Sequence, residues 1–266
     1  MQPLIPWFET PSIPIPNPWF PNLGIHGFGV LVAIGFWLGT WLAGRKARQD
    51  GLDSDLPGQL VGWIIISLFV GGHLFHALFY DWERTIADPM YLLRLWDGLS
   101  STGGFIASVL ATIWFFKLHK KVAYFPHADT IAYGLIFGWA LGRLGCFVAH
   151  DHPGMETSFY LGVYGICPSG DLSVACHDLG LYEALWAMAT AAVFWVLNRT
   201  PRRPGFFVSL LCLSYAPFRF AGDFLRHPDT DDRWLGLTPA QYFTLALVVI
   251  GVAVWIASRR WKPIRG

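Results

Sequence analysis

Charged side chains are scarce in this chain, and their scarcity argues against most soluble architectures. Asp, Glu, Lys and Arg make up 14% of the 266 residues, whereas 54% of the residues are hydrophobic. Soluble domains average about 25% charged residues, and the mean hydropathy of +0.42 also favours a chain that lies in a bilayer. The net charge of +1 comes without a dense basic tract, so we expect no nucleic-acid partner.

Several signatures of metalloenzymes and soluble hydrolases are missing as well. The sequence contains no HExxH or CxxC spacing, no GxSxG nucleophile motif and no phosphate-binding P-loop. We therefore expect no bound metal and no cofactor. The proline-rich N-terminus has no basic segment before an apolar core, so we also expect no cleavable signal peptide.

Long apolar runs are abundant, and they define the expected fold. A membrane-crossing helix needs about 20 apolar residues, and seven runs approach or reach that length, although the third is short. They lie at about residues 25–44, 59–80, 103–117, 130–148, 181–197, 205–222 and 240–257. The sequence predicts an all-α integral membrane protein with seven transmembrane helices in a single membrane domain, residues 1–266.

The distribution of basic residues predicts the orientation of these spans. Lysines and arginines follow spans one, three, five and seven, and by the positive-inside rule these ends face the cytoplasm. The N-terminus is then outside and the C-terminus cytoplasmic. The remaining basic residues are all arginines on or near the outer face, where planar guanidinium groups suit recognition of phosphate or carboxylate: Arg84, Arg94, Arg143, Arg219, Arg226 and Arg233.

Two outer segments complete the predicted architecture. Residues 1–24 carry Trp7, Phe8, Trp19 and Phe20 and are expected to form an interfacial arm in the headgroup layer, the alternative being a flexible tail. Residues 149–180 are expected to form a periplasmic head segment, in which Cys167 and Cys176 could pair in an oxidising compartment. Cys146 and Cys212 are interpreted as small apolar fillers of the spans.

The stretch GRLGCFVAHDHPG, residues 142–154, is the strongest candidate site. An arginine at the end of an apolar span is costly without an anionic partner, so we predict that Arg143 holds a phosphate at the membrane surface. The neighbouring His150, Asp151 and His152 would carry out the chemistry or shape the site. The alternative is that these histidines cap the helix end or pair with a carboxylate.

Two further stretches add acidic and basic residues to the predicted outer face. Arg219, Asp223 and Arg226 have the spacing i, i+4 and i+7, which places them on one face of a helix. Asp223 would orient both guanidinium groups toward a lipid phosphate, or would simply neutralise them. Glu183 begins a span and is expected to pair with one of the outer arginines.

Paired glycines and a histidine cluster leave alternatives open. Gly103 and Gly104, after Thr102, would allow close approach of a ligand or, equally, tight helix packing. The H-D-H spacing is weak support for a metal site. Its possible members are His150, Asp151, His152, His177 and Asp178.

Several motifs, in order along nearly the whole chain, resemble the prolipoprotein diacylglyceryl transferase family. They are LGIHGFGVLVAIGFWLGTWLAGRKAR, GGHLFHALFYDW, STGGFIASVLA, GRLGCFVAHDHPG, LYEALW and FRFAGDFLRHPD with LGLTPAQYFTLAL. The fourth stands where the family signature G-R-x-G-N-F-x-N-x-E-x-x-G belongs. The resemblance implies a seven-span enzyme of the bacterial inner membrane with its site toward the periplasm, expected to be a monomer.

The implied reaction moves the diacylglyceryl group of phosphatidylglycerol onto the cysteine thiol of a prolipoprotein lipobox. A thioether forms and glycerol-1-phosphate leaves. Arg143, Gly145 and Gly154 match the signature, and Arg219 and Arg226 match the late motif, so Arg143 and Arg219 are the expected phosphate clamp. The remaining expected substrate-binding residues are Gly154, Asp223, Arg226, Thr102, Gly103, Gly104, Cys146 and Glu183.

The chain departs from the family pattern at several positions beside the expected chemistry. Cys146 and Ala149 replace asparagines, Asp151 and Asp223 replace glutamates, Thr102 replaces a histidine, and Phe28 replaces a tyrosine. We hypothesise that His150 or His152, oriented by Asp151, accepts the thiol proton instead.

Three other functions stay open at this point. A divergent member could bind phospholipid but use another acceptor, or be non-catalytic. A metal-dependent membrane hydrolase could use His150, His152 and His177. A transporter is less favoured, because no paired inverted segments are visible.

Overall fold

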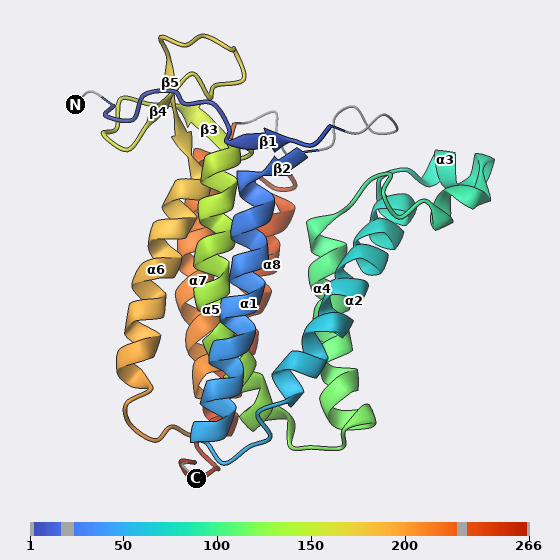
Figure 1. Ribbon diagram of the computed structural model, residues 1–266, viewed down its shortest axis with the longest axis vertical. Coiled ribbons are helices and arrows are strands. Elements are labelled where there is room, and N and C mark those ends of the chain that lie inside the picture. Colours follow the sequence, from blue (N-terminus) through green and yellow to red (C-terminus); the bar gives the residue numbers. More distant parts are fainter. Residues whose placement is uncertain (1–2, 17–23, 228–232, 265–266) are drawn as a thin grey trace.

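The computed structural model describes residues 3–16, 24–227 and 233–264, without the side chains of Ser101 and Thr102. Most of these residues are helical (Figure 1). The α-helices are α1 (Gly27–Gln49), α2 (Leu56–Phe79), α3 (Trp82–Ala87), α4 (Ser101–Ile113), α5 (Tyr124–Ala149), α6 (Leu179–Leu197), α7 (Phe206–Gly222) and α8 (Pro239–Ser258). Short turns of other helix types are η1 (Pro89–Leu93), the π-helix η2 (Trp114–His119) and η3 (Asp223–Leu225).

Within the described residues, five helices are long and apolar enough to cross a membrane: α1, α2, α5, α6 and α8. The protein is therefore a predominantly helical, multi-pass membrane protein. The third and sixth predicted runs coincide with shorter helices, namely α4 with its continuation η2, and the 17-residue α7. Helix α5 begins at Tyr124 instead of near residue 130. Its first turns carry Asp129, whose carboxylate accepts the N–H groups of Phe206 and Val208 at the start of α7.

Helices α1 and α5 pack backbone against backbone. A Cβ on Gly35 would lie 2.7 Å from the Gly138 carbonyl oxygen, and a Cβ on Gly134 would lie 2.1 Å from the Gly39 carbonyl oxygen. Both helices thus carry a glycine pair at i, i+4, the spacing that lets membrane helices approach most closely. This contact fixes α1 along the whole of α5, the helix that ends at the Arg143 stretch.

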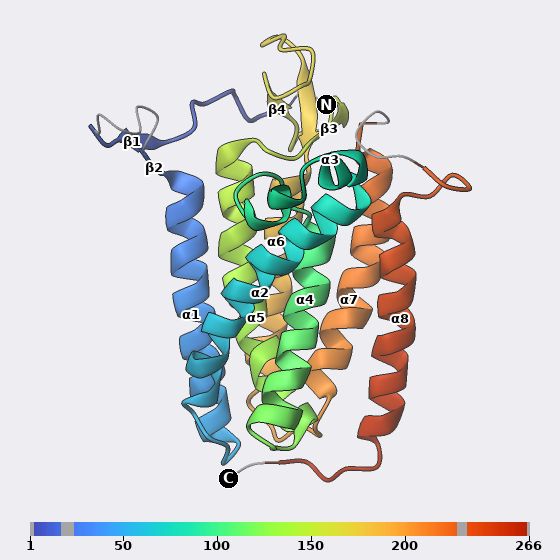
Figure 2. The ribbon, with the colours of Figure 1, turned by 90° about the vertical axis from the view of Figure 1, so that its right-hand side faces the viewer.

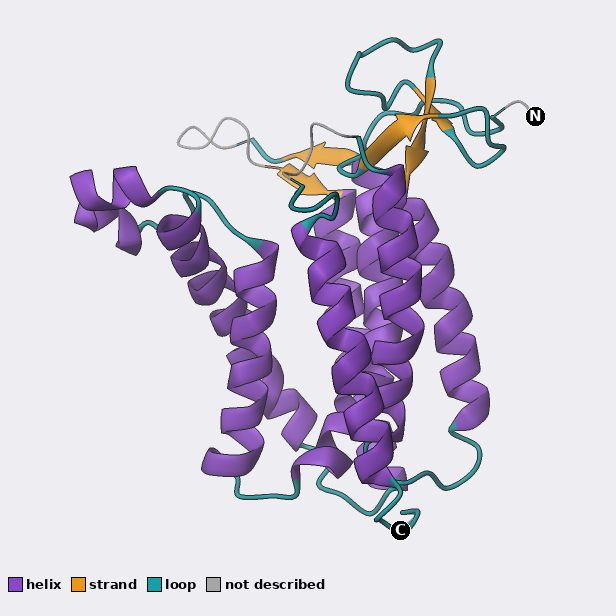
Figure 3. Cartoon of the chain, turned by 180° about the vertical axis from the view of Figure 1, so that it is seen from behind, coloured by secondary structure: helices purple, strands orange, loops and turns teal. Residues whose placement is uncertain are grey.

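Helices α2 and α4 form a separate pair that leans away from the other five long helices (Figures 1 and 3). Gly103 and Gly104 lie at their contact: a Cβ on Gly103 would meet the Phe75 Cβ at 2.1 Å, and one on Gly104 would meet the Leu68 carbonyl oxygen at 3.1 Å. The two glycines predicted to admit a ligand or a helix therefore face helix α2. The side chain of Thr102 lies outside the described residues.

The main hydrophobic core lies between α5, α6 and α7. Its buried members are four alanines, three aromatic residues and one isoleucine: Ala132, Tyr133, Ile136, Ala140, Ala187, Ala191, Phe194 and Phe207. Alanines let the three helices approach, and the rings fill the space that remains. The bundle holds the ends of α5, α6 and α7 together, where the candidate site is built.

Above this end of the bundle, residues between α5 and α6 form a small sheet (Figure 2). Its antiparallel strands are β3 (Pro153–Glu156), β5 (Ala175–Asp178) and β4 (Val163–Tyr164), in the order β3-β5-β4. Cys167 and Cys176 form a disulfide that closes the loop between β4 and β5. The pairing considered from the sequence is thus present.

The described part of the N-terminal arm is built into this head. Ile5 pairs with Val163 in a parallel bridge, and the Phe8 ring lies 4.3 Å from the His150 ring. Strand β1 (Ser12–Pro14) then pairs with β2 (Gly24–His26), which leads into α1. Trp19 and Phe20 lie outside the described residues.

Candidate functional site

An ion pair between Arg143 and Glu183 is the centre of the candidate site. Arg143 lies near the end of α5 and Glu183 in the first turns of α6, and the Arg143 Nε atom is 3.1 Å from the Glu183 Oε1 atom. The Glu183 side chain is 4% exposed and that of Arg143 is 23% exposed. The carboxylate is therefore enclosed, while the guanidinium keeps an open side. The expectation that Glu183 pairs with an outer arginine is confirmed.

Two aromatic side chains complete the hydrogen bonding of Glu183. The Trp139 indole N–H and the Tyr215 hydroxyl both donate to its Oε1 atom, over 3.1 and 3.0 Å. Trp139 lies one turn before Arg143 on α5 and Tyr215 lies on α7. A carboxylate held by three donors has little freedom to move, so it fixes the position of the arginine.

Cys146, Asp151 and His152 lie on the other side of the arginine. The Arg143 Nη1 atom is 3.7 Å from the Cys146 Sγ atom and 3.4 Å from the His152 Nε2 atom. Because a guanidinium can only donate, His152 accepts at Nε2 and its Nδ1–H donates to the adjacent Asp151 carboxylate. Cys146 is buried, as expected for a filler of the span, and its sulfur also contacts Arg143.

Potential metal ligands occur in one group within the described residues. Donor atoms of Cys146, Asp151 and His152 lie within 4.8 Å of one another. The soft donors Sγ and Nε2 suit a transition metal, but the Arg143 guanidinium already lies against both of them. A cation there would meet this charge, so the residues present do not fit a metal well.

The cluster of His150, His152 and His177 proposed for a hydrolase does not form. His150 adopts the left-handed conformation at the end of α5, with φ of 53°, and its Nε2–H donates to the Phe8 carbonyl oxygen over 3.1 Å. Its Nδ1 atom lies 3.8 Å from the Asp178 carboxylate. His177 instead contacts the Tyr182 hydroxyl at 2.8 Å. The turn at His150 points the three rings at different partners.

Asp178 is a buried carboxylate of the head, and its burial shifts its pKa. Its carboxylate caps α6 by accepting the Leu181 N–H over 2.8 Å, and its side chain is 1% exposed. Burial raises the pKa of this carboxyl from its usual value to about 7. Burial also lowers the pKa of His177.

Asp223 is a second buried carboxylate that holds arginines. Its Oδ1 atom lies 3.2 Å from Arg219 Nη2 and 3.1 Å from Arg226 Nε, and its other oxygen accepts from the Thr238 hydroxyl. The predicted single helical face is wrong in detail, because α7 ends at Gly222 and a 3-10 turn follows. That turn still brings both guanidinium groups to Asp223.

Two connections bring the arginine groups to the same end of the bundle. Gly154 and Arg226 form an antiparallel backbone bridge, and a Cβ on Gly154 would lie 2.4 Å from the Leu225 carbonyl oxygen. Tyr215, which donates to Glu183, is one turn before Arg219 on α7. Gly154 is therefore a packing position between the head and the end of α7.

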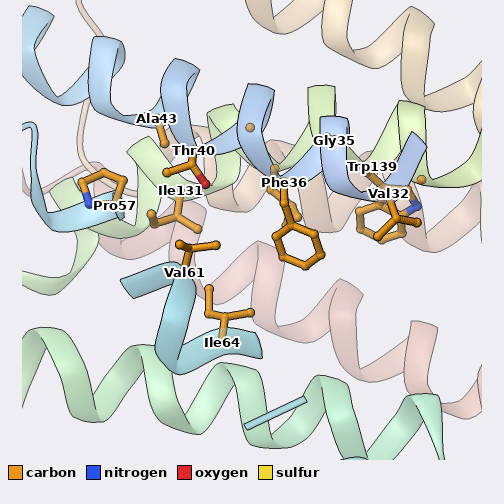
Figure 4. A pocket seen from close by; sticks show the side chains of 14 residues that line it. Val32, Gly35, Phe36, Thr40, Ala43, Pro57, Val61, Ile64, Ile131 and Trp139 are labelled. Atoms are coloured by element: carbon orange, nitrogen blue, oxygen red, sulfur yellow. The ribbon is translucent and has the colours of Figure 1, made fainter. Parts of the chain in front are cut away.

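An apolar cavity of about 260 Å³ lies beside this charged cluster, between α1, α2 and α5 (Figure 4). Phe36 and Ile64 project into it from α1 and α2, and Trp139 lies at one end. The same Trp139 donates to Glu183, and Gly142, next to Arg143, also lines the cavity. The apolar cavity and the Arg143 site thus share Trp139 as a wall residue.

Three of these residues were not singled out from the sequence, although each carried a signal. Trp139 and Tyr215 lie four residues before Arg143 and Arg219, where an i, i+4 neighbour shares the helix face. Thr238-Pro239-Ala240-Gln241 has the pattern of a capping box with proline at the first helical position, and the structure forms that box.

Comparison with known proteins adds the family assignment. The family profile described as prolipoprotein diacylglyceryl transferase matches residues 18–257. Proteins named phosphatidylglycerol–prolipoprotein diacylglyceryl transferase are similar to this chain. That of Chromohalobacter salexigens is 34% identical over 89% of each chain, and that of Ectopseudomonas mendocina is 32% identical over 92% of this chain and 93% of its own. The chain belongs to the prolipoprotein diacylglyceryl transferase family.

Proposed function

We propose that this protein transfers the diacylglyceryl group of phosphatidylglycerol to the lipobox cysteine of a prolipoprotein. The named relatives support this substrate pair. The observation that carries the proposal is the partly exposed Arg143, fixed by buried Glu183 beside an apolar cavity. A lipid phosphate could meet the guanidinium while its acyl chains occupy the apolar space.

We assign the phosphate of the donor to Arg143, with Arg219 as a second contact. In the reaction the thiolate attacks the glyceryl carbon that bears the phosphate, an S–C bond forms, and the C–O bond breaks. The electron pair goes to the phosphate oxygen of departing glycerol-1-phosphate. Guanidinium groups positioned in advance would stabilise the charge that develops on this leaving group.

We assign removal of the thiol proton to His152. Its Nε2 atom carries a lone pair beside Arg143, and Asp151 holds the opposite ring nitrogen. This lone pair accepts from Arg143 here, and it would be released to act as a general base when the guanidinium turns to the lipid phosphate. His150 is less suitable, because its Nε2–H is bound to the Phe8 carbonyl.

We further propose that all seven apolar helices cross the bacterial inner membrane, with the N-terminus outside and the catalytic cluster toward the periplasm. Basic residues support this orientation, because the C-terminal ends of α1, α6 and α8 meet at the end of the bundle opposite to the head (Figure 1). The disulfide in the head also fits an exported compartment. A monomer would suffice, since the arginine cluster is built within one chain.

Complementation of a strain depleted of its own transferase tests the proposal, with transfer to a lipobox peptide as the biochemical readout. Wild type should restore growth and form the thioether, and Arg143→Ala should do neither at equal membrane abundance. Phospholipid binding without transfer would instead support a divergent member with another acceptor. Rescue by Arg143→Ala would contradict the assignment of the phosphate.

A further inference from the structure

A second pocket, of about 400 Å³, lies at the end of the bundle opposite to the Arg143 cluster. Its lining residues come from the last turns of α1, the first half of α5, and the end of α6 with the loop that follows. We refer to it as the basic pocket, and its lining includes Arg45, Lys46, Gln49, Asn198 and Arg199. This volume falls in the range of small-molecule sites, about 300–1,000 Å³.

The charge of the basic pocket is positive. Three of its side chains are cationic, and its carboxylate, Asp50, is bound to Lys46 Nζ at 2.5 Å. Lys46 is 6% exposed at its side chain and lies 5.2 Å from the Phe207 ring. Lys46 and Asp50 therefore pair within the wall, and Arg45 and Arg199 are the other two cations that line the pocket.

Fixed polar groups form the back of the basic pocket. The Asn198 side-chain amide donates to Gln49 over 3.0 Å and so ties the end of α6 to α1. The buried Tyr133 of α5 also lines the pocket. Arg199 lies 4.5 Å above the Trp195 ring, and Arg45 lies 5.7 Å from the Trp41 ring. The two guanidinium groups are thus supported on aromatic rings beside the pocket.

The same tryptophans locate the pocket relative to the bilayer. Trp41 and Trp195 are about half exposed and lie in the last three turns of two long apolar helices. Tryptophan at such positions sits at the level of the lipid headgroups, and basic pockets between helices at this level suit anionic headgroups. A phosphate group arriving from the lipid side would meet both arginines at that depth.

We propose that the basic pocket binds the phosphate headgroup of an anionic phospholipid from the leaflet opposite to the catalytic site. Arg45 and Arg199 contact the phosphate, and Asn198 and Gln49 offer hydrogen bonds to the rest of the headgroup. The lipid joins the ends of α1 and α6. A free phosphate ester shares the same chemistry, but the flanking tryptophans favour the membrane as its source.

Native mass spectrometry of the full, delipidated chain in detergent tests this site. Phosphatidylglycerol is titrated against wild type and the double variant Arg45→Gln/Arg199→Gln. The apparent Kd of one bound lipid should rise by about thirtyfold in the variant, because two cations of the headgroup contact are lost. Arg143→Gln should weaken binding of a different lipid, the one at the catalytic site. If the catalytic assignment failed, the result for the basic pocket could therefore still be interpreted.

Two matched variants and two ligands sharpen the test. Arg260→Gln, at the same end but away from the pocket, and Arg48→Gln, which lines a neighbouring hollow with Arg45, should bind within about twofold of wild type. Equal melting temperatures of the delipidated proteins show that folding is intact. Unchanged binding in the double variant, equal binding of phosphatidylcholine, loss in Arg48→Gln, or occupancy by inorganic phosphate alone would overturn the proposal.

Discussion

The two ends of the helical bundle differ in what their cationic side chains contact. At the head end the cations are arginines held mainly by carboxylates: Arg84 by Asp97, Arg94 by Asp88, Arg143 by Glu183, and both Arg219 and Arg226 by Asp223. At the opposite end several cations lie over aromatic rings: Arg45, Arg199 and Arg259 over tryptophans, and Lys117 over Tyr124.

This difference distinguishes charges that orient the protein in the membrane from charges that are positioned to act at one site. A cation over an exposed ring keeps its charge available to the membrane surface, which suits the positive-inside bias. A guanidinium fixed on a buried carboxylate points in one direction, which suits a site that must stabilise charge at one place. The following changes test that contrast, from the largest expected effect to the smallest.

Arg143→Gln should give the largest loss of transfer. Removing a fixed guanidinium from the leaving group should lower kcat/KM by about a thousandfold, a typical effect for removal of a transition-state charge partner. The matched control is Arg84→Gln, which breaks the exposed pair with Asp97 and should change kcat/KM less than about threefold. Similar losses in both variants would show that fixed geometry is irrelevant.

His152→Ala should follow, with kcat/KM lower by about a hundredfold, because a general base contributes at least that much. His150→Ala should have a smaller effect, since its ring holds the Phe8 carbonyl. Transfer to a lipobox peptide gives the distinguishing measurement: kcat/KM should fall much further in His152→Ala than in His150→Ala. Full activity in both single variants would eliminate a histidine base.

Glu183→Gln and Asp50→Asn compare a buried ion pair at each end. Both leave a cation without its carboxylate, and both should lower the free energy of unfolding, by about 3 kcal/mol for an enclosed pair. Only Glu183→Gln should also lower kcat/KM, by roughly tenfold, since Arg143 loses its support. Thermal melting and transfer assays on the same preparations separate the two effects. An equal activity loss in Asp50→Asn would contradict the assignment of the site to one end.

The smallest effect concerns the pH dependence of the head. The pKa of Asp178 is raised to about 7 on folding, so the folded state binds the extra proton between about pH 4 and 7. Stability from this carboxyl is therefore greatest below its unfolded pKa and falls as pH rises through about 7. The melting temperature should drop from pH 5 to pH 8 in wild type and drop less in Asp178→Asn. Asp171→Asn, an exposed position, should retain the wild-type drop.

Helix positions and the main ion pair could be predicted because their signals are local. An apolar run of membrane length predicted α6, and the lone glutamate within that run predicted that Glu183 has a partner. The identity of the arginine that pairs with Glu183 could not be predicted from the sequence, because Arg143 and Glu183 come together only when α5 packs on α6. The roles of His150 and His152 also depended on structure, since one left-handed residue turns the neighbouring rings apart.

Contacts between distant segments also distinguished structural alternatives that the local sequence pattern left open. The sequence around Gly103 and Gly104 allowed either a ligand or a helix to lie close to them, and in the structure helix α2 packs against both glycines. Cys146 was interpreted as a filler because its surrounding sequence is apolar, and the helix turn also places its sulfur beside Arg143. Such side-chain directions follow from packing between distant segments, which no local window contains.

The bridge between Ile5 and Val163 constrains the order in which the protein can mature. Ile5 finds its partner only after α5 and strand β4 exist, so this part of the arm must wait until those later segments have been synthesised. Closing so long a loop is slow compared with pairing neighbouring helices. The catalytic end therefore becomes complete late, after the helices beneath it have assembled.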